Sequence, residues 1–331
     1  MAGRRRKKSG GRSYAWRYRG RIVACVFVEI LIICALVIMI GWNKGVKEWF
    51  EQFEQPVLKE VDISGINSPN AILMQARGGK ILGEINGEAQ IYPASMTKIM
   101  TVILGIENFD DLDEKITLTN EMFSGLYEQD ATQAGFQPGE EVRVIDLLYG
   151  AMLPSGAECC IALADTISGS EADFAELMNK KARKLGMENT HFCDSTGLHN
   201  PDHYSTVKDI AVLMKYCIKN DTFREIVETS RHSTGVTNIH PDGITYYSTM
   251  FKNLSDPTVT GGKILGGKTG YTSEAGHCLV SFAEIEGREY IFVSAGVSGA
   301  DGNTIPHIQD AVTVYNRVGA AIEEKMNDNN K

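Results

Sequence analysis

The sequence predicts an α+β domain in which an antiparallel sheet is built from both ends of the chain, with a helical lobe inserted between them. Strand-like runs flank turn residues within 71–83 and again within 277–297, whereas the segment between them carries apolar residues at helical spacing. An apolar run close to the N-terminus adds one transmembrane helix. With 331 residues, the chain is long enough to bury a sizeable core.

The N-terminal region predicts a membrane anchor. Residues 1–21 carry nine Lys and Arg and no acidic residue, and residues 22–42 are predominantly apolar. A 21-residue helix is about 31 Å long, which matches the ~30 Å hydrocarbon core of a bilayer. The alternative is a cleaved signal peptide, but no Ala-x-Ala pattern follows Met39. We therefore expect a single-pass plasma-membrane protein with a cytoplasmic N-terminus and an extracellular body.

The charge distribution argues against nucleic acid as a partner. The net charge is −9, but the chain beyond residue 21 carries 24 basic and 42 acidic residues, or −18. An acidic body of this kind repels a phosphate backbone.

Residues 43–65 are charged and contain Pro56, which predicts a juxtamembrane linker. The folded domain is expected over 66–325 and a polar tail over 326–331.

The elements of the folded domain follow from periodicity and turn residues. A Gly-Gly pair separates the two runs of the first hairpin, and residues 286–288 separate the two strands of the second. Residues 110–138 are irregular, with two short strand-like runs, and 193–205 is loop-like. The other expected elements are strands at 277–285 and 289–297 and helices at 144–152, 157–167, 171–185, 207–219 and 308–324.

Ser95 and Lys98 are the first candidate catalytic pair. Pro93 stops the preceding segment, and Ser95 is a good first-turn residue for a helix with apolar residues at 99, 102, 103 and 106. Lys98 then lies on the same side of the helix as Ser95. A serine hydroxyl is a weak nucleophile until a base takes its proton, and a buried lysine can remain neutral for that task. The alternative is a helix cap followed by a solvated lysine.

Two further motifs support the catalytic interpretation. Pro154 and Gly156 predict a tight turn that presents Ser155 to a cleft, although Ser155 could also be a plain turn residue. Lys268 and Thr269 lie in the Gly-rich stretch Gly-Gly-Lys-Thr-Gly-Tyr, ahead of a strand-like run. The order Ser-x-x-Lys, Ser-Gly, Lys-Thr-Gly is that of the penicillin-recognising serine enzymes.

With these motifs, residues 66–297 resemble the serine-type D-alanyl-D-alanine carboxypeptidases, the low-molecular-mass penicillin-binding proteins. The matching stretches are 93–98, 146–150 with 153–156, 196–199 with 203–206, and 267–276. The resemblance implies the penicillin-recognising fold, an antiparallel sheet with a helical subdomain. It also implies removal of the terminal D-alanine from peptidoglycan stem pentapeptides, with β-lactams as inhibitors.

The resemblance implies a role for each site residue. Ser95 corresponds to the nucleophile, Lys98 to the general base, and Ser155 to the hydroxyl that relays a proton to the leaving D-alanine. The remaining correspondences concern substrate binding: Lys268 and Thr269 for the terminal carboxylate, Gly270 for close approach of the substrate, and the Tyr271 backbone N–H, with that of Ser95, for the oxyanion.

Two departures from the family pattern leave alternatives open. The second motif usually reads Ser-x-Asn, and here Ala157 occupies the third position. A catalytically silent wall-binding or β-lactam-binding protein is therefore one alternative, and a serine β-lactamase is another. Many members also carry a C-terminal β-rich domain, for which too few residues follow Val297. The N-terminal span would then provide the anchoring.

No metal or cofactor is expected. His199 and His203 are four residues apart, but Pro201 prevents a helical metal pair, and no His-Glu-x-x-His or phosphate-loop pattern occurs. Both histidines are expected to be loop or capping residues. The five cysteines that follow the apolar run show no regular spacing and are odd in number, which argues against a disulfide framework.

Overall fold

The computed structural model describes residue 30 and the ranges 58–254, 256–298 and 305–329. Apart from Ile30, the predicted span over 22–42 lies outside these residues, as does the basic segment before it. Among the described residues, no helix combines the length and apolarity needed to cross a membrane. The description below concerns the compact unit that contains residues 58–329.

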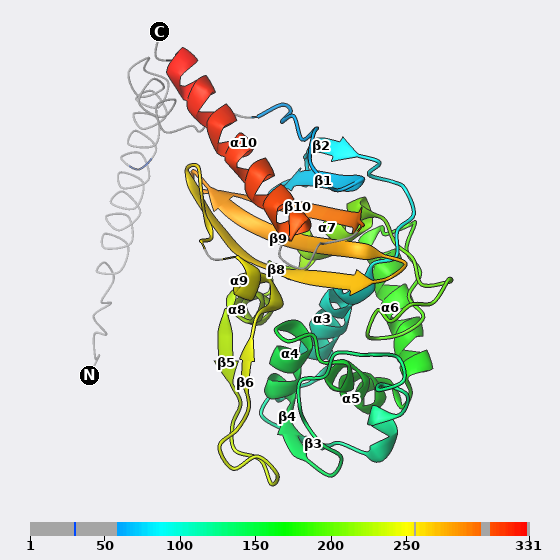
Figure 1. Ribbon diagram of the computed structural model, residues 1–331. Coiled ribbons are helices and arrows are strands. Elements are labelled where there is room, and N and C mark those ends of the chain that lie inside the picture. Colours follow the sequence, from blue (N-terminus) through cyan, green and yellow to red (C-terminus); the bar gives the residue numbers. More distant parts are fainter. Residues whose placement is uncertain (1–29, 31–57, 255, 299–304, 330–331) are drawn as a thin grey trace, which may run out of the picture. The chain divides into compact units, whose positions relative to one another are not determined.

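An antiparallel sheet of six strands forms the upper layer of this unit (Figure 1). Its order is β2-β1-β10-β9-β8-β7, so the N-terminal hairpin joins the sheet through β1, which pairs with the C-terminal strand β10. The prediction of a sheet assembled from both chain ends is therefore confirmed. The strands are β1 Asn70–Gln75, β2 Ile81–Ile85, β7 Thr258–Val259, β8 Gly262–Thr272, β9 Gly276–Ile285 and β10 Arg288–Val297.

The helical lobe lies beneath the sheet and is formed by the residues between β2 and β7 (Figure 1). Helices predicted over 144–152 and 171–185 are found with those bounds. The helices are η1 Ala94–Thr97, α3 Lys98–Asn108, η2 Asn120–Phe123, α4 Val144–Met152, α5 Ala157–Ser168, α6 Glu171–Leu185, α7 Val207–Cys217, α8 Asp221–Glu228 and α9 Thr249–Asn253. Two small hairpins complete the lobe: β3 Lys115–Thr117 with β4 Glu141–Arg143, and β5 Arg231–Ser233 with β6 Thr245–Tyr247.

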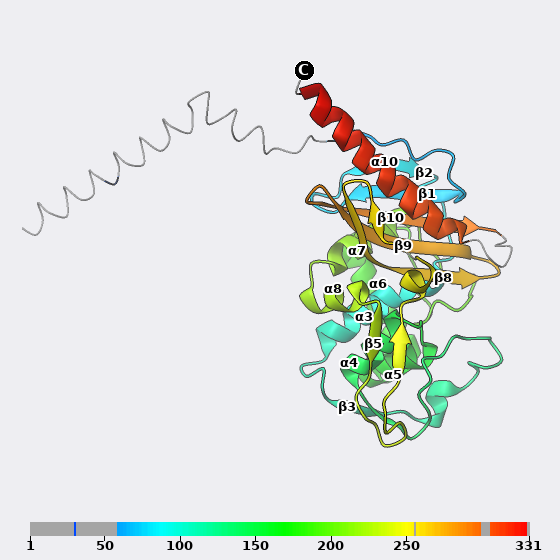
Figure 2. The same cartoon turned by 60° about the vertical axis from the view of Figure 1, so that its left-hand side comes forward.

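Both faces of the sheet are buried, by different helices. Successive side chains of a strand point to opposite faces. In β1, Ile72 packs with the helical lobe, whereas Leu73 packs with the last helix, α10 Pro306–Asn329. Figure 2 shows α10 crossing one face, with α3 and α7 on the other side. The central strands are thus enclosed between two hydrophobic layers.

Three expectations about element boundaries were wrong. Ser95 lies in a 3₁₀ turn, and the α-helix begins only at Lys98. The closing helix extends to Asn329 instead of giving way to a polar tail from 326, because no Gly or Pro interrupts that segment. Residues 262–272 form one continuous strand, although the sequence predicted only a Gly-rich stretch ahead of a strand. Glycines lower β propensity, which concealed this strand.

Candidate active site

Ser95 and Lys98 are in direct contact at the junction of η1 and α3. Lys98 Nζ lies 2.9 Å from Ser95 Oγ and donates a hydrogen bond to the Thr196 carbonyl at 2.7 Å. The Lys98 side chain is almost fully buried, and this burial lowers its pKa. The predicted pair is therefore present, with the lysine buried instead of solvated.

The backbone before Ser95 is held in an uncommon conformation. Ala94 has φ of 47°, in the left-handed region that non-glycine residues rarely adopt. Gly197 packs directly against it, since a Cβ atom on Gly197 would lie 1.9 Å from the Ala94 carbonyl oxygen. The loop that supplies the Thr196 carbonyl to Lys98 thus also supports the turn that carries Ser95. Strain of this kind commonly marks functional sites.

Ser155 joins the pair from the turn between α4 and α5. Its hydroxyl donates to Ser95 Oγ at 3.0 Å, and its φ of 74° is again in the left-handed region. The turn predicted from Pro154 and Gly156 does present Ser155 to the cavity that Ser95 lines. The Ser95 hydroxyl therefore contacts two groups that can exchange protons with it, the Lys98 amine and the Ser155 hydroxyl.

A buried network that the sequence analysis missed holds the loop beside Lys98. Asp194 Oδ1 accepts hydrogen bonds from the backbone N–H groups of Thr196 and Gly197. Asp194 Oδ2 lies 3.0 Å from His203 Nδ1. Burial alone would raise the pKa of Asp194, but hydrogen bonds from His203 and Thr196 outweigh it and lower the pKa to about 2. His203 is therefore more than the expected loop or capping residue.

Glu158 does not occupy the place of the missing asparagine amide. Its Oε1 turns away to accept the backbone N–H groups of Ala134 and Gly135, at 2.6 and 2.9 Å. Within the described residues no hydrogen bond links Glu158 to Lys98, and burial raises the pKa of the Glu158 carboxyl. Ala157 itself is buried at the start of α5.

The Lys-Thr-Gly motif lies within β8, alongside η1. Lys268 is 1% exposed, and its Nζ donates to the Thr269 carbonyl at 2.9 Å. Burial lowers the pKa of Lys268, and the charge of Lys98 lowers it further. A Cβ atom on Gly270 would lie 3.0 Å from the backbone nitrogen of Ser95, so glycine allows this close approach. The side chain of Tyr271 is 60% exposed.

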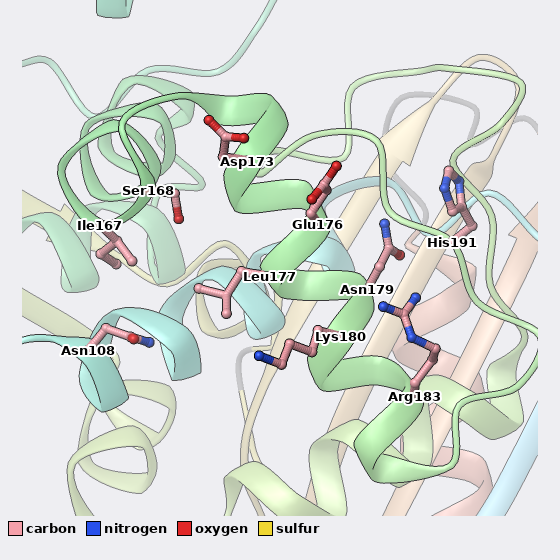
Figure 3. Close-up of a pocket in the computed structure, with 10 residues that line it drawn as sticks. All are labelled: Asn108, Ile167, Ser168, Asp173, Glu176, Leu177, Asn179, Lys180, Arg183 and His191. Carbon is pink, nitrogen blue, oxygen red and sulfur yellow. The ribbon is translucent and has the colours of Figure 1, made fainter.

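A cavity of about 380 Å³ unites these groups. Six of the seven predicted site residues line it, and Lys98 reaches it through its contact with Ser95. The six are Ser95, Ser155, Lys268, Thr269, Gly270 and Tyr271. A larger hollow of about 810 Å³ lies along α6, away from these residues. Figure 3 shows the side chains that line it, which come from α6 and from Asn108, Ile167, Ser168 and His191 on neighbouring segments.

The remaining candidate groups have structural surroundings. His199 is exposed and packs edge-on against Tyr92, while His203 is buried beside Asp194. Within the described ranges, no group of three or more His, Cys, Asp or Glu is placed to hold a metal ion. The five cysteines of these ranges are all free.

Comparison with known proteins gives consistent matches. The family model for D-alanyl-D-alanine carboxypeptidase, peptidase S11, matches residues 57–299. The carboxypeptidase DacF of Bacillus subtilis is 34% identical over 231 residues, which are 69% of this chain and 57% of DacF. DacC of Escherichia coli is 33% identical over 67% of this chain and 55% of DacC. The chain thus spans somewhat more than half the length of these two curated relatives.

Solved structures agree with the sequence matches. The Streptomyces K15 DD-transpeptidase superposes with a TM-score of 0.69 at 28% identity, covering 79% of this chain and all of that one. A D-alanyl-D-alanine carboxypeptidase from Mycobacterium tuberculosis gives 0.69 at 22% identity over 81% of this chain and 96% of that one, and this likeness concerns the fold alone. The expected fold of sheet and helical subdomain is therefore confirmed.

Proposed function

The chain belongs to the peptidase S11 family of D-alanyl-D-alanine carboxypeptidases, and on that premise we propose that it removes the terminal D-alanine from peptidoglycan stem pentapeptides through an acyl-enzyme on Ser95. The observation that carries this proposal is the meeting of Lys98 Nζ and Ser155 Oγ on Ser95 Oγ, at 2.9 and 3.0 Å. A nucleophile with a base on one side and a proton relay on the other is the arrangement that acyl transfer requires.

The geometry supports a two-step reaction. Neutral Lys98 takes the proton of Ser95, whose oxygen attacks the carbonyl of the D-Ala-D-Ala bond. The backbone N–H groups of Ser95 and Tyr271 would stabilise the oxyanion, a contribution of about 2.7–4 kcal/mol per donor in comparable enzymes. Ser155 passes the proton to the amine of the departing D-alanine. Water then cleaves the ester and restores Ser95.

Burial of the two lysines fits this assignment. A lysine acts as a base only when it is neutral, and desolvation disfavours its charged form. Burial lowers the pKa of both Lys98 and Lys268, and Lys98 alone of the two contacts the serine hydroxyl. We therefore assign the base to Lys98, and to Lys268 and Thr269 the groove that holds the terminal carboxylate of the substrate.

The proposed location is the outer face of the plasma membrane. Residues 22–42 would anchor the chain, the basic residues before them would stay in the cytoplasm, and the folded domain that contains residues 58–329 would reach peptidoglycan.

A direct test uses fluorescent penicillin and a pentapeptide ending in D-Ala-D-Ala. The chain should be labelled covalently and should release D-alanine, and Ser95→Ala should abolish both while retaining the melting temperature of the native chain. Labelling without D-alanine release would indicate a silent β-lactam-binding protein. Rapid turnover of penicillin would indicate a β-lactamase instead.

A further inference from the structure

Two stacked histidines line the same cavity as the catalytic serines. His277 on β9 and His307 on α10 have ring centroids 5.0 Å apart and ring planes within 11° of parallel. Tyr271 also packs against His277, with ring centroids 4.6 Å apart. Both histidines line the cavity together with Ser95 and Ser155. The mechanism described above uses neither ring.

His307 contains a buried polar atom without a partner. The residue is 4% exposed, and its Nδ1 forms no hydrogen bond with any described residue. A buried, unpaired nitrogen costs stability, so its retention calls for an explanation. His307 is also the second residue of α10, where the helix dipole provides a positive potential that favours an anion.

The charges around His307 come from few groups. Burial and, to a smaller extent, the neighbouring His277 lower its pKa to about 4, although Asp310 one turn along α10 opposes this shift. Asp310 is already paired, since it accepts hydrogen bonds from Asn67 and Ser68. Tyr271 faces His277, whose own pKa is lowered by burial. At neutral pH both rings are therefore uncharged in the empty cavity.

A substrate of the proposed reaction brings a carboxylate into this cavity. Among the described lining residues, the groups able to carry positive charge are Lys268, His277 and His307, and Asp130 carries the opposite charge. The Lys268 ammonium is buried, and it already donates to the Thr269 carbonyl. The Lys268 ammonium has two further N–H donors, so the histidine pair is a second source of positive charge in the cavity, beside Lys268.

We propose that His307, backed by His277, is a further binding residue for the terminal carboxylate of the pentapeptide, beside Lys268 and the Thr269 hydroxyl. This inference rests on the proposed carboxypeptidase function. The incoming carboxylate favours the imidazolium form of His307, so binding takes up one proton from solvent. Two positive rings 5.0 Å apart would repel each other, so the pair holds a single proton.

The kinetic test compares a peptide ending in D-Ala-D-Ala acid with the same peptide ending in the amide. In the native chain, kcat/KM for the acid peptide divided by kcat/KM for the amide should rise as the pH is lowered from 7.5 to 5.5. His307→Ala should lower kcat/KM for the acid about 10- to 100-fold, mainly through KM, and leave the amide within twofold. His307→Gln, which keeps a donor without a titrating charge, should recover part of the loss but none of the pH dependence. The matched control is His191→Gln, an exposed residue that does not line this cavity.

A second readout needs no turnover. In the Ser95→Ala chain, NMR titration should show the pKa of His307 rising by at least one unit when the acid peptide binds, and no change with the amide. Equal losses for acid and amide in the His307 variants, or an unchanged His307 pKa, would overturn the binding role of His307. Absence of penicillin labelling and of D-alanine release in the native chain would instead refute the proposed function. The NMR titration would still report on acid binding in that case.

Discussion

His203 Nε2 lies 2.9 Å from Thr97 Oγ1, which fixes an imidazole against the residue next to Lys98. Through its other nitrogen the same ring contacts Asp194, and Asp194 holds the backbone of Thr196, whose carbonyl accepts a hydrogen bond from Lys98. Lys98 is thus positioned by a chain of contacts that begins at its neighbour Thr97 and ends at the Lys98 ammonium.

Removal of this imidazole is expected to misplace the base. His203→Ala leaves the Thr97 hydroxyl and one oxygen of Asp194 without their partner, a cost of about 1–3 kcal/mol for a buried polar group. We expect kcat for D-alanine release to fall at least tenfold with KM within twofold, and His203→Gln to recover part of the loss. Steady-state kinetics and urea denaturation measure the two effects separately. A stability loss with unchanged kcat would limit His203 to a structural role.

The network also predicts a dependence of stability on pH. The pKa of Asp194 is about 2 in the folded chain, below its ordinary value of 3.8. A carboxyl group whose pKa is lower in the folded than in the unfolded state stabilises the fold at pH values above the unfolded-state pKa. This stabilisation is lost as the pH falls from about 4 to 2. The shift corresponds to about 2 kcal/mol. Urea denaturation should therefore show that the native chain has a larger free energy of unfolding than Asp194→Asn at pH 6. This difference in free energy should narrow as the pH falls towards 2.

Ala157→Asn tests the departure in the second motif. The first turn of α5 lies near Lys98, whose pKa responds to the neighbouring Glu158 and Cys160. An amide at 157 could then accept a hydrogen bond from Lys98, and we expect kcat/KM to be kept or raised. Second-order rates of penicillin acylation provide the measurement, with Ala164→Asn in the buried part of the same helix as a folding control. A hundredfold fall, about 2.7 kcal/mol of transition-state stabilisation, would show a pocket built around alanine.

The proposed topology predicts the outcome of protease treatment. Protease added to intact spheroplasts should digest the domain that carries Ser95, detected by loss of the penicillin-labelled band, and should spare an epitope placed before residue 21. Protection of the labelled domain, or a soluble labelled form cut near residue 42, would contradict the anchor. A cytoplasmic marker enzyme that stays intact is the control for spheroplast integrity.

Local signals explain which parts of the fold were predictable. Helix α6 begins with the Ser170 hydroxyl accepting the N–H of Asp173 and ends at Gly186 in the left-handed conformation, so both boundaries are encoded in neighbouring residues. The motif residues Ser95, Lys98 and Ser155 could likewise be recognised in the sequence. What the structure adds to them is the contacts with Thr196 and the burial of the lysine.

The groups that the sequence did not reveal depend on distant partners. His203 meets Thr97 across 106 positions, and nothing near either residue indicates the contact. His277 and His307 come together because β9 and α10 pack against each other, which no local pattern encodes. The strand β8 was hidden by its glycines, which are needed because neighbouring atoms leave no room for a side chain.

The pairing of β1 with β10 also constrains how the protein is made. Asn70 is aligned with Ala295, so a central contact of the sheet joins residues 225 positions apart. Contacts of such long sequence separation form late and slow folding, because a large loop must close first. The helical lobe, contiguous from α3 to α9, can collapse while synthesis continues. We therefore expect the N-terminal hairpin to leave the ribosome with an unpaired strand edge, and the edge to stay unpaired until β10 has been synthesised.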